Sequence, residues 1–471
     1  MVARHMMTCV GEKFGMSEVG SGSRLSLGQK FGWAVGAHGT STMIGVLVTY
    51  LLNYMTDTLG IAAFTAGAII FAARMYDLVT DPLMGYISDR TRSRWGRRRP
   101  YLLLGAIVCF IAFVALFNVP EIESKTGMIL YTGFMLILFT TAYTIFNVPY
   151  LTMPAEMTDS YNERTSMMGY RVIFFTTANL GLFLGGSLLL KNYGPEQGYS
   201  LMGWLLGVVL LASMLASFFA TRNAPQIERT EVVTYSVREQ IAMVWDNKPF
   251  CIYLMVKLCQ LIAQASSQAA LLFFGIYVLQ RGEELLFAFG TYFTVSTLIT
   301  IPIWTWAAKR FTKKPAYMAA ALIYAAVMAS WLLSNAAEPM WIVNARIFGI
   351  GVAVTGILVV GFSILPDTME YDRRRTGLNR EGIYAGLYST MEKAASGFGP
   401  LLFGAYLGAM GYVSTRGGET VAQPDAAVTG IYIGLGVFPA VAALLSAVLL
   451  IFYKLDEKML KEAELVTSAK E

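Results

Sequence analysis

The chain has 471 residues, of which 55% are hydrophobic and only 14% are charged, and its mean hydropathy is +0.53. Soluble domains carry about 25% charged residues, so this composition excludes an ordinary soluble protein and indicates a membrane protein. The net charge of +5 is concentrated in short loops, which favours a role in membrane topology over nucleic-acid binding. The four cysteines show no metal-ligand spacing.

Twelve segments are apolar enough to span a bilayer, for which about 20 residues are needed. We expect these spans at residues 30–55, 62–88, 100–119, 127–153, 168–191, 199–221, 249–280, 285–307, 316–335, 341–365, 382–412 and 427–453. Basic loops alternate along the chain with loops that hold few Lys and Arg residues. The positive-inside rule therefore predicts that the basic loops and both termini are cytoplasmic.

The polar stretch 222–248 is the longest interval between spans and divides the chain into two bundles, 27–221 and 249–453. A cytoplasmic leader, 1–26, and a cytoplasmic tail, 454–471, complete the predicted organisation. The halves repeat one another, because the loop 95–100 recurs as 310–315 and the loop 154–165 recurs as 366–376. We predict an all-α membrane protein with twelve transmembrane helices in two six-helix repeats. This arrangement resembles the major facilitator fold, in which substrate binds between the halves.

The span 62–88 contains two acids, Asp77 and Asp81, which a helix places on one face because they are four residues apart. A carboxylate at the bilayer centre costs roughly 2.5–3.5 kcal/mol on insertion scales. A cation, protons or a buried basic partner is needed to make the pair tolerable. Directly afterwards, residues 90–99 hold six arginines at the membrane edge. A paired acid site that opens onto a basic loop is typical of an ion-coupled transporter.

Three further features of the predicted spans leave two interpretations open each. Arg74 is either a functional group or a partner for one of the two acids. Lys257 lies two turns inside its span and is either a functional charge within the membrane or, as its position favours, a side chain that extends to the surface. A stripe with helical spacing suits either a seam between helices or the lining of a cavity, and it consists of Gln260, Gln264 and Gln268.

The span 382–412 carries a second charged stretch, Glu392 and Lys393, about three turns from its start. Because a deep unpaired charge is costly, Lys393 is expected to have a function. Glu392 is either a local partner of Lys393 or an independent site. His38, in the first span, is either a hydrogen-bonded packing residue or a proton carrier.

The stretch Asp77–Pro100, with its pattern DxxxDPxxGxxxDRTRSRWGRRRP, strongly resembles the glycoside–pentoside–hexuronide:cation symporter family. The segment 147–150 (NVPY), Arg171 and the stretch 379–393 extend this resemblance over nearly the whole chain. The extended arginine loop is far more specific than the general loop pattern of the superfamily.

The resemblance implies a role for each matching position. The implied cation-binding residues are Asp77, Asp81 and Thr144, together with Thr80, which stands where the family's galactoside carrier has an asparagine. The implied substrate-binding residues are Ser41, Tyr143, Asn147, Tyr150, Arg171, Tyr388 and Lys393. The implied gating residues are Gly85, Asp89, Arg90, Arg97 and Arg98.

Three departures from the family pattern concern the substrate. Ser41 and Asn147 stand where the family's galactoside carrier uses carboxylates to hold sugar hydroxyls, and Leu151 stands where it has a tryptophan. Because Arg171 and Lys393 are kept, the cavity is less negative than in that carrier. We therefore expect an anionic substrate such as a hexuronide, or a zwitterion, to be favoured over a neutral galactoside such as melibiose.

These features predict a secondary active transporter in the cell membrane that couples uptake of a glycoside, uronide or related carbohydrate to Na⁺ or H⁺. A lysolipid or amphiphile transporter of the same fold, and an uncoupled facilitator, are the alternatives. A channel or receptor would not need repeated loops or a two-acid ion site. No hydrolytic or redox motif appears, so we expect a non-enzyme without cofactors, with a small-molecule substrate, no nucleic-acid partner and a monomeric state.

Overall fold

The computed structural model describes residues 25–158, 161–225, 245–376, 381–418, 421–455 and 459. Within these ranges the regular structure is helical, apart from one isolated β-bridge between Leu59 and Arg416. The fold is therefore an all-helical membrane protein, as predicted.

The N-terminal half consists of five helical segments. These are α2 (Leu27–Thr49), continued by α3 (Leu51–Asn53) and the π-helix η1 (Tyr54–Thr58), then α4 (Ala63–Arg90), α5 (Arg99–Phe117), α6 (Lys125–Met157) and α7 (Tyr161–Thr221). α7 is broken at Gly194, whose φ of 74° favours glycine, and Pro195 follows. This break separates the predicted spans 168–191 and 199–221.

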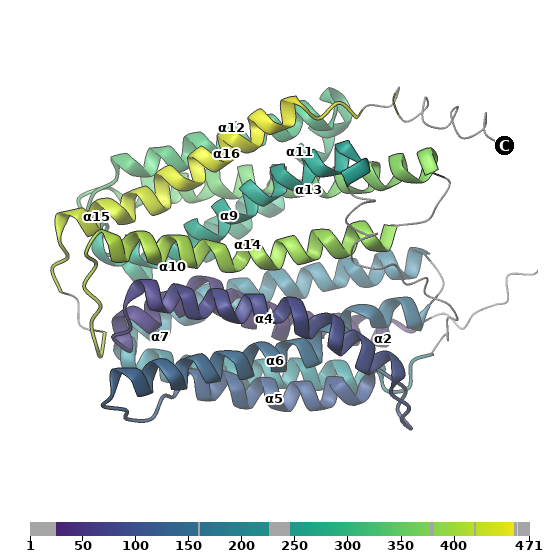
Figure 1. The fold of residues 1–471 in the computed structure, drawn as a ribbon, viewed down its shortest axis with the longest axis horizontal. Coiled ribbons are helices and arrows are strands. Elements are labelled where there is room, and N and C mark those ends of the chain that lie inside the picture. Colours follow the sequence, from purple (N-terminus) through teal and green to yellow (C-terminus); the bar gives the residue numbers. More distant parts are fainter. Residues whose placement is uncertain are drawn as a thin grey trace, which may run out of the picture.

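The C-terminal half contains the remaining helices. These are α9 (Lys248–Tyr277), α10 (Gly282–Ala288) with η2 (Phe289–Phe293) and α11 (Thr294–Phe311), α12 (Lys313–Ser330) with η3 (Trp331–Leu333), α13 (Met340–Thr376), α14 (Glu381–Ala409), and α15 (Asp425–Tyr432) with η4 (Ile433–Val437) and α16 (Phe438–Ile451). The two halves lie side by side in Figure 1, with α4 of the first half along α14 of the second.

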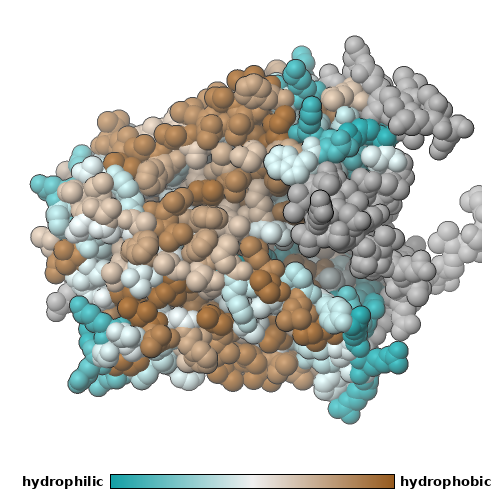
Figure 2. Space-filling view, viewed as in Figure 1, coloured by the Kyte–Doolittle hydropathy of each residue, from teal (hydrophilic) through white to brown (hydrophobic). Residues whose placement is uncertain are grey.

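Nine of the described helices are long and apolar enough to span a membrane, or ten if α2 and its bent continuation form one span. The 56-residue stretch Ser166–Thr221 counts once in this number although it is broken at Gly194. The number twelve stays a prediction. Figure 2 shows a broad apolar band across the middle of the molecule, with polar residues at its two ends. A protein with such a band lies across a bilayer.

We call the two ends of the bundle the basic end and the opposite end. The basic end holds residues 89–99, 309–315 and 370–376, and the opposite end holds residues 57–61, 118–124, 278–282 and 410–418. Capping residues mark the start of two helices at the basic end, α2 and α9. The hydroxyl of Ser26 accepts from Gln29 N at 3.1 Å in a capping box, and Asn247 caps α9 by accepting from Phe250 N at 3.1 Å.

The halves approach most closely along α4 and α14, on the side of the opposite end. A Cβ atom on Gly67 would lie 2.6 Å from the carbonyl oxygen of Pro400, and one on Gly404 would lie 2.4 Å from that of Ala63. Small residues allow two helix backbones to approach this closely in a membrane. This contact sets the position of the charged residues in the middle of α4 and α14.

Candidate functional site

The two acids of α4 each have a basic partner. Asp77 is 1% exposed, and its Oδ2 accepts from Arg74 Nη1 of the same helix at 3.1 Å. Asp81 forms an ion pair with Lys393, which comes from α14 in the other half. The pairing of Arg74 with a neighbouring acid, one of the two interpretations above, is therefore correct. Lys393 pairs with Asp81 and not with the adjacent Glu392.

Asp81 differs from Asp77 in its exposure and in its other contact. The side chains of Asp81 and Lys393 are each 20% exposed, whereas Asp77 is enclosed. Thr144 of α6 donates to Asp81 Oδ1 at 2.8 Å. The hydroxyl of Thr80 instead donates to the carbonyl of Tyr76 in its own helix at 3.3 Å. The structure thus places the hydroxyl of Thr144 against Asp81. The hydroxyl of Thr80 is instead bonded within its own helix.

Aromatic and polar side chains of the N-terminal half surround the next part of the site. Tyr150 is fully buried and its ring stacks on Trp33, with 4.8 Å between the ring centroids. Asn147 is buried, and its Oδ1 has no hydrogen-bond partner among the described residues. Arg171, on α7, lies within electrostatic range of Tyr143 and Tyr150. These four predicted substrate residues therefore gather on the inner face of α6 and α7.

Ser41 is placed differently from the other predicted substrate residues. It is 1% exposed, donates to the carbonyl of Phe175 at 3.1 Å and accepts from Asn179 Nδ2 at 2.7 Å. Both contacts join α2 to α7. The Ser41 hydroxyl is therefore used in hydrogen bonds between two helices. Its role in substrate binding stays a prediction.

The C-terminal half contributes α9 and α14. Lys257 is 0% exposed and donates to Gln260 Oε1 at 2.5 Å, and Gln260 Nε2 donates in turn to Gln264 Oε1 at 3.1 Å. The expectation that Lys257 extends to the surface is therefore wrong, because its ammonium is held inside by these amides. On α14, Tyr388 stacks on Tyr253 of α9, with 6.3 Å between centroids.

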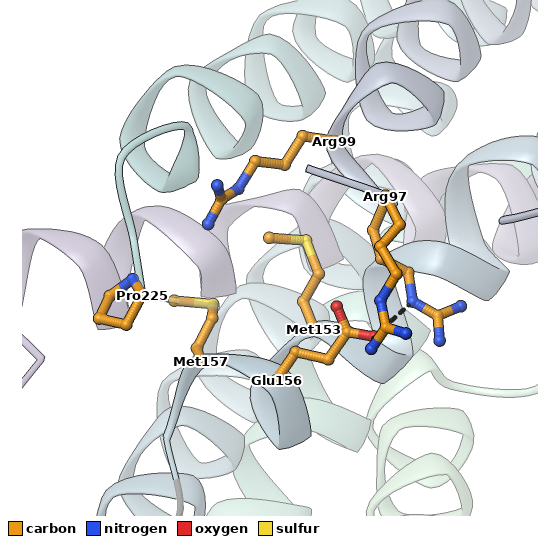
Figure 3. A pocket seen from close by; sticks show the side chains of 7 residues that line it. Arg97, Arg99, Met153, Glu156, Met157 and Pro225 are labelled. Carbon is orange, nitrogen blue, oxygen red and sulfur yellow. Dashed lines mark hydrogen bonds and ion pairs between the residues drawn. The ribbon is translucent and has the colours of Figure 1, made fainter. Parts of the chain in front are cut away.

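The predicted gating residues form a cluster at the basic end, within the N-terminal half. Arg98 forms ion pairs with Asp89 and with Glu156, and donates to Ser88 Oγ at 2.8 Å. Arg97 also forms an ion pair with Glu156, at 2.9 Å. Figure 3 shows the two side chains beside each other. The cluster borders a small, partly open pocket lined by Arg97, Arg98, Arg99, Met153, Glu156, Met157 and Pro225.

The other gating candidates lie beside this cluster. The Arg90 guanidinium sits over the ring of Tyr86, 3.8 Å from its centroid. A Cβ on Gly85 would have Val148 Cγ1 as its nearest neighbour, at 3.9 Å. In Figure 3, Arg99 points away from Glu156, and it donates to the carbonyl of Ala224. Among the described residues, the ion pairs of this cluster join α4, α5 and α6 within the N-terminal half.

A second buried acid, Asp57, links the two halves at the opposite end. Its Oδ2 accepts from Asn53 at 2.8 Å and from Tyr277 of α9 at 3.0 Å, and its Oδ1 accepts from Tyr412 at 2.5 Å. The carbonyl of Asp57 also accepts from Thr415 Oγ1 at 3.1 Å and from Gly418 N at 2.8 Å. We call Asp57, Asn53, Tyr277, Tyr412 and Thr415 the Asp57 cluster.

The sequence alone did not identify Asp57, Glu156 or Trp33 as site residues. Asp57 resembles any loop acid near a predicted span end, and its partners Tyr277 and Tyr412 are distant in sequence. Glu156 belongs to a repeated loop motif, which was the one available signal. Trp33 gave no signal because an aromatic residue in a span is usually a packing residue.

Comparisons with known proteins agree with this architecture. A family model described as MFS/sugar transport protein matches residues 32–457. A glucuronide carrier protein homolog of Escherichia coli is 26% identical, with 92% of this chain and 93% of that protein aligned. An isoprimeverose transporter of Lactiplantibacillus pentosus is 25% identical over 93% and 91% of the two chains.

Solved structures are similar in fold. A bacterial homolog of the human lysosomal transporter Spinster has a TM-score of 0.67 at 12% identity and covers 93% of this chain and 97% of its own. The nucleoside transporter NupG has a TM-score of 0.62 at 13% identity, covering 90% of this chain and 100% of its own. These likenesses show the fold alone. The family match, which spans most of the chain, confirms the predicted relationship: the chain belongs to the MFS/sugar transport family, in its glycoside–pentoside–hexuronide:cation symporter branch, and is a transporter and not an enzyme.

Proposed function

We propose that the chain carries a carbohydrate across the cell membrane together with Na⁺ or H⁺, and that Asp81 and Asp77 bind the coupling cation. The observation that carries this proposal is the contact set of Asp81, which joins a hydroxyl of α6 and an ammonium of α14 to one partly exposed carboxylate. Carboxylate and hydroxyl oxygens are suitable ligands for a hard cation.

The coupling step is an exchange of partners at Asp81. Lys393 supplies the positive charge that a carboxylate within the membrane needs in the present conformation. A bound cation supplies the same charge and makes the lysine unnecessary. Because Lys393 belongs to the other half, its release removes an attractive contact between the halves. Cation binding is thereby coupled to movement of one half against the other.

The contacts between the halves support an inward-facing conformation. The Asp57 cluster joins them at the opposite end. At the basic end, by contrast, the ion pairs found in the described ranges connect helices of the same half, as in Lys30–Glu163 and Lys313–Asp367. The positive-inside rule places the basic end in the cytoplasm. The Asp57 cluster then holds the transporter closed toward the outside.

The substrate binds between the two halves, beside α6, α7 and α14. Arg171 offers a guanidinium that is suited to a carboxylate or sulfonate. Relatives include the glucuronide carrier homolog and a putative sulfoquinovose importer of Salmonella typhimurium, which is 25% identical over 92% of this chain and 91% of its own. Both names denote sugars with an anionic group, which supports a glycoside or uronide substrate.

Counterflow in proteoliposomes tests this function. Vesicles preloaded with unlabelled glycoside, uronide or lysolipid should accumulate the labelled form of one sugar class, and an imposed Na⁺ or H⁺ gradient should increase its accumulation. Counterflow of lysolipid alone would establish the amphiphile alternative. Sugar counterflow that no cation gradient changes would establish an uncoupled facilitator, and the absence of any counterflow would refute a carrier of these substrates.

A further inference from the structure

Helices α9 and α14 face each other along a regular series of contacts. Both run from the basic end to the opposite end. The rings of Phe250 and Tyr384 lie 4.7 Å apart, and those of Tyr253 and Tyr388 follow one turn later, at 6.3 Å. Further on, Gly399 faces Ala265 so closely that a Cβ on the glycine would lie 2.4 Å from the alanine Cβ.

The same series places Lys257 opposite Glu392. Each residue is four positions beyond a member of the Tyr253–Tyr388 pair, and positions four apart share one face of a helix. Because α9 and α14 run in the same direction, one turn along both helices leads to facing positions. The two charges interact electrostatically, and Arg171 of the N-terminal half also acts on Glu392.

Lys257 and Glu392 differ in their exposure. Lys257 is fully buried, and its Nζ lies 3.5 Å from where a Cβ on Gly361 would be and donates to Gln260. Glu392 is exposed although it lies in the middle of a helix within the apolar band. The lysine is thus a fixed positive charge, whereas the carboxylate is open to a molecule that enters between the halves.

We propose that Glu392 is a substrate-binding residue whose carboxylate accepts hydrogen bonds from two adjacent hydroxyls of a sugar, and that Lys257 is a positioning residue behind it. This proposal deepens the proposed function and rests on it. A carboxylate has two oxygens and accepts paired donors, which suits neighbouring ring hydroxyls. The positive charges of Lys257 and Arg171 stabilise the ionised form of Glu392 within the membrane.

The proposal also accounts for the missing carboxylates of the N-terminal half. Ser41 is enclosed and committed to α7, and Asn147 carries an amide in place of an acid. Glu392 supplies an acceptor of sugar hydroxyls from the other half. An anionic group on the same sugar remains free to meet Arg171. Glu392 therefore recognises hydroxyls on one side of the substrate, and Arg171 recognises the negative charge on the other side.

The test uses the full-length protein in proteoliposomes with methyl β-D-glucoside, methyl β-D-xyloside and methyl β-D-glucuronide as probes. For whichever probe wild type carries, Glu392→Gln should raise the counterflow KM about tenfold or more, since hydrogen bonds to charged groups are the strong ones. The cation concentration for half-maximal effect should stay unchanged. Glu392→Asp should recover part of the affinity, and Glu123→Gln, which alters an exposed acid in a loop, is the matched control.

Single-deoxy derivatives of the carried probe identify the hydroxyls. Removal of a hydroxyl that binds Glu392 should weaken binding to wild type and cause little further loss in Glu392→Gln. Lys257→Gln should raise KM less than Glu392→Gln, with rescue by Lys257→Arg. The proposal is overturned if Glu392→Gln leaves KM unchanged, or if it shifts only the cation dependence, which would make Glu392 a coupling group. If wild type carries none of the three probes, sugar transport itself fails and this proposal fails with it.

Discussion

Two buried carboxylates, Asp77 in the acid pair and Asp57 at the opposite end, are stabilised in different ways. Asp77 is 1% exposed and has Arg74 as its partner, while its neighbour Asp81 has Lys393. Asp57 is 6% exposed and accepts from an asparagine and two tyrosines, which are neutral. One site balances charge with charge, and the other surrounds a charge with oriented dipoles.

The two modes of stabilisation suit the two sites to different roles. A carboxylate that is neutralised by a lysine can exchange that lysine for another cation with little change in net charge. A carboxylate held by several neutral donors needs all of them in place, because a buried acceptor that loses its donors becomes costly. The acid pair is therefore suited to binding and releasing an ion. The Asp57 cluster is suited to joining the two halves in one conformation.

The largest effect is expected from the acid pair. Asp81→Asn removes the charge that a coupling cation needs, so cation-driven accumulation should fall to background. Counterflow, which needs no cation gradient, should persist in part because the fold is kept. Radiolabelled uptake in proteoliposomes measures both, with the exposed acid variant Asp425→Asn as the control. Accumulation at the wild-type level in Asp81→Asn would remove the coupling site from α4.

The Asp57 cluster should respond more moderately to loss of one donor. Burial and the nearby Asp57 raise the pKa of the Tyr412 hydroxyl, so it stays protonated and donates throughout the physiological range. Tyr412→Phe should weaken closure of the opposite end by about 10- to 150-fold, the range for one hydrogen bond to a charged group. A cysteine at Thr58, which is 7% exposed, should then react faster with a membrane-impermeant maleimide. Tyr193→Phe, at an exposed tyrosine, is the control, and equal reactivity in both variants would mean that the cluster does not hold this end closed.

A smaller effect is expected at the basic end, where Asp89 is 54% exposed on its side chain and pairs with Arg98. Exposed ion pairs contribute up to about 1 kcal/mol, so Asp89→Ala should slow turnover about twofold to fivefold. Equilibrium binding of the substrate should change less. Arg98 keeps Glu156 and Ser88 as partners, which limits the damage. An unchanged turnover number together with unchanged cysteine reactivity at both ends would exclude a gating role for Asp89.

The smallest expected effect concerns substrate charge. Asn147→Asp adds a negative charge near Arg171, so the affinity ratio of a uronide to its neutral glycoside should fall a few-fold. The equivalent change at Ser41 is a poor test, since an acid there would lose the contacts with Phe175 and Asn179. Binding of methyl β-D-glucuronide and methyl β-D-glucoside gives the ratio. Equal wild-type affinity for the two sugars would mean that shape alone sets specificity.

The sequence predicted the helices well but their side-chain partners only in part. The predicted span 62–88 corresponds to α4, Ala63–Arg90, because hydrophobicity and the arginine loop mark both ends. The turn within α7 could be expected from Gly194 and Pro195. Spacing along one helix predicted that Asp77 and Asp81 share a face and offered Arg74 as a partner.

Contacts between distant helices could not be predicted in this way. Hydrophobic periodicity does not say which helix lies beside α4, so the link from Asp81 to Lys393 needed the fold. The prediction for Lys257 was wrong because its distance from the span end suggested that the side chain reaches the surface. The amide side chains of α9 hold its ammonium inside the bundle. Ser41 appeared available for substrate because its partners on α7 are far away in sequence. Thr80 occupies a position of the family's cation site, but its hydroxyl donates to a carbonyl of its own helix.

The most direct test of the coupling site is the linkage between cation and substrate binding. Isothermal titration of the purified protein with its sugar, at increasing Na⁺ and at decreasing pH, should show tighter sugar binding as one of the two cations becomes more concentrated. Reciprocity requires the sugar to tighten binding of that cation by the same factor. In Asp81→Asn the sugar affinity should no longer depend on the cation. A cation dependence in Asp81→Asn equal to that of wild type would contradict the assignment of coupling to Asp81.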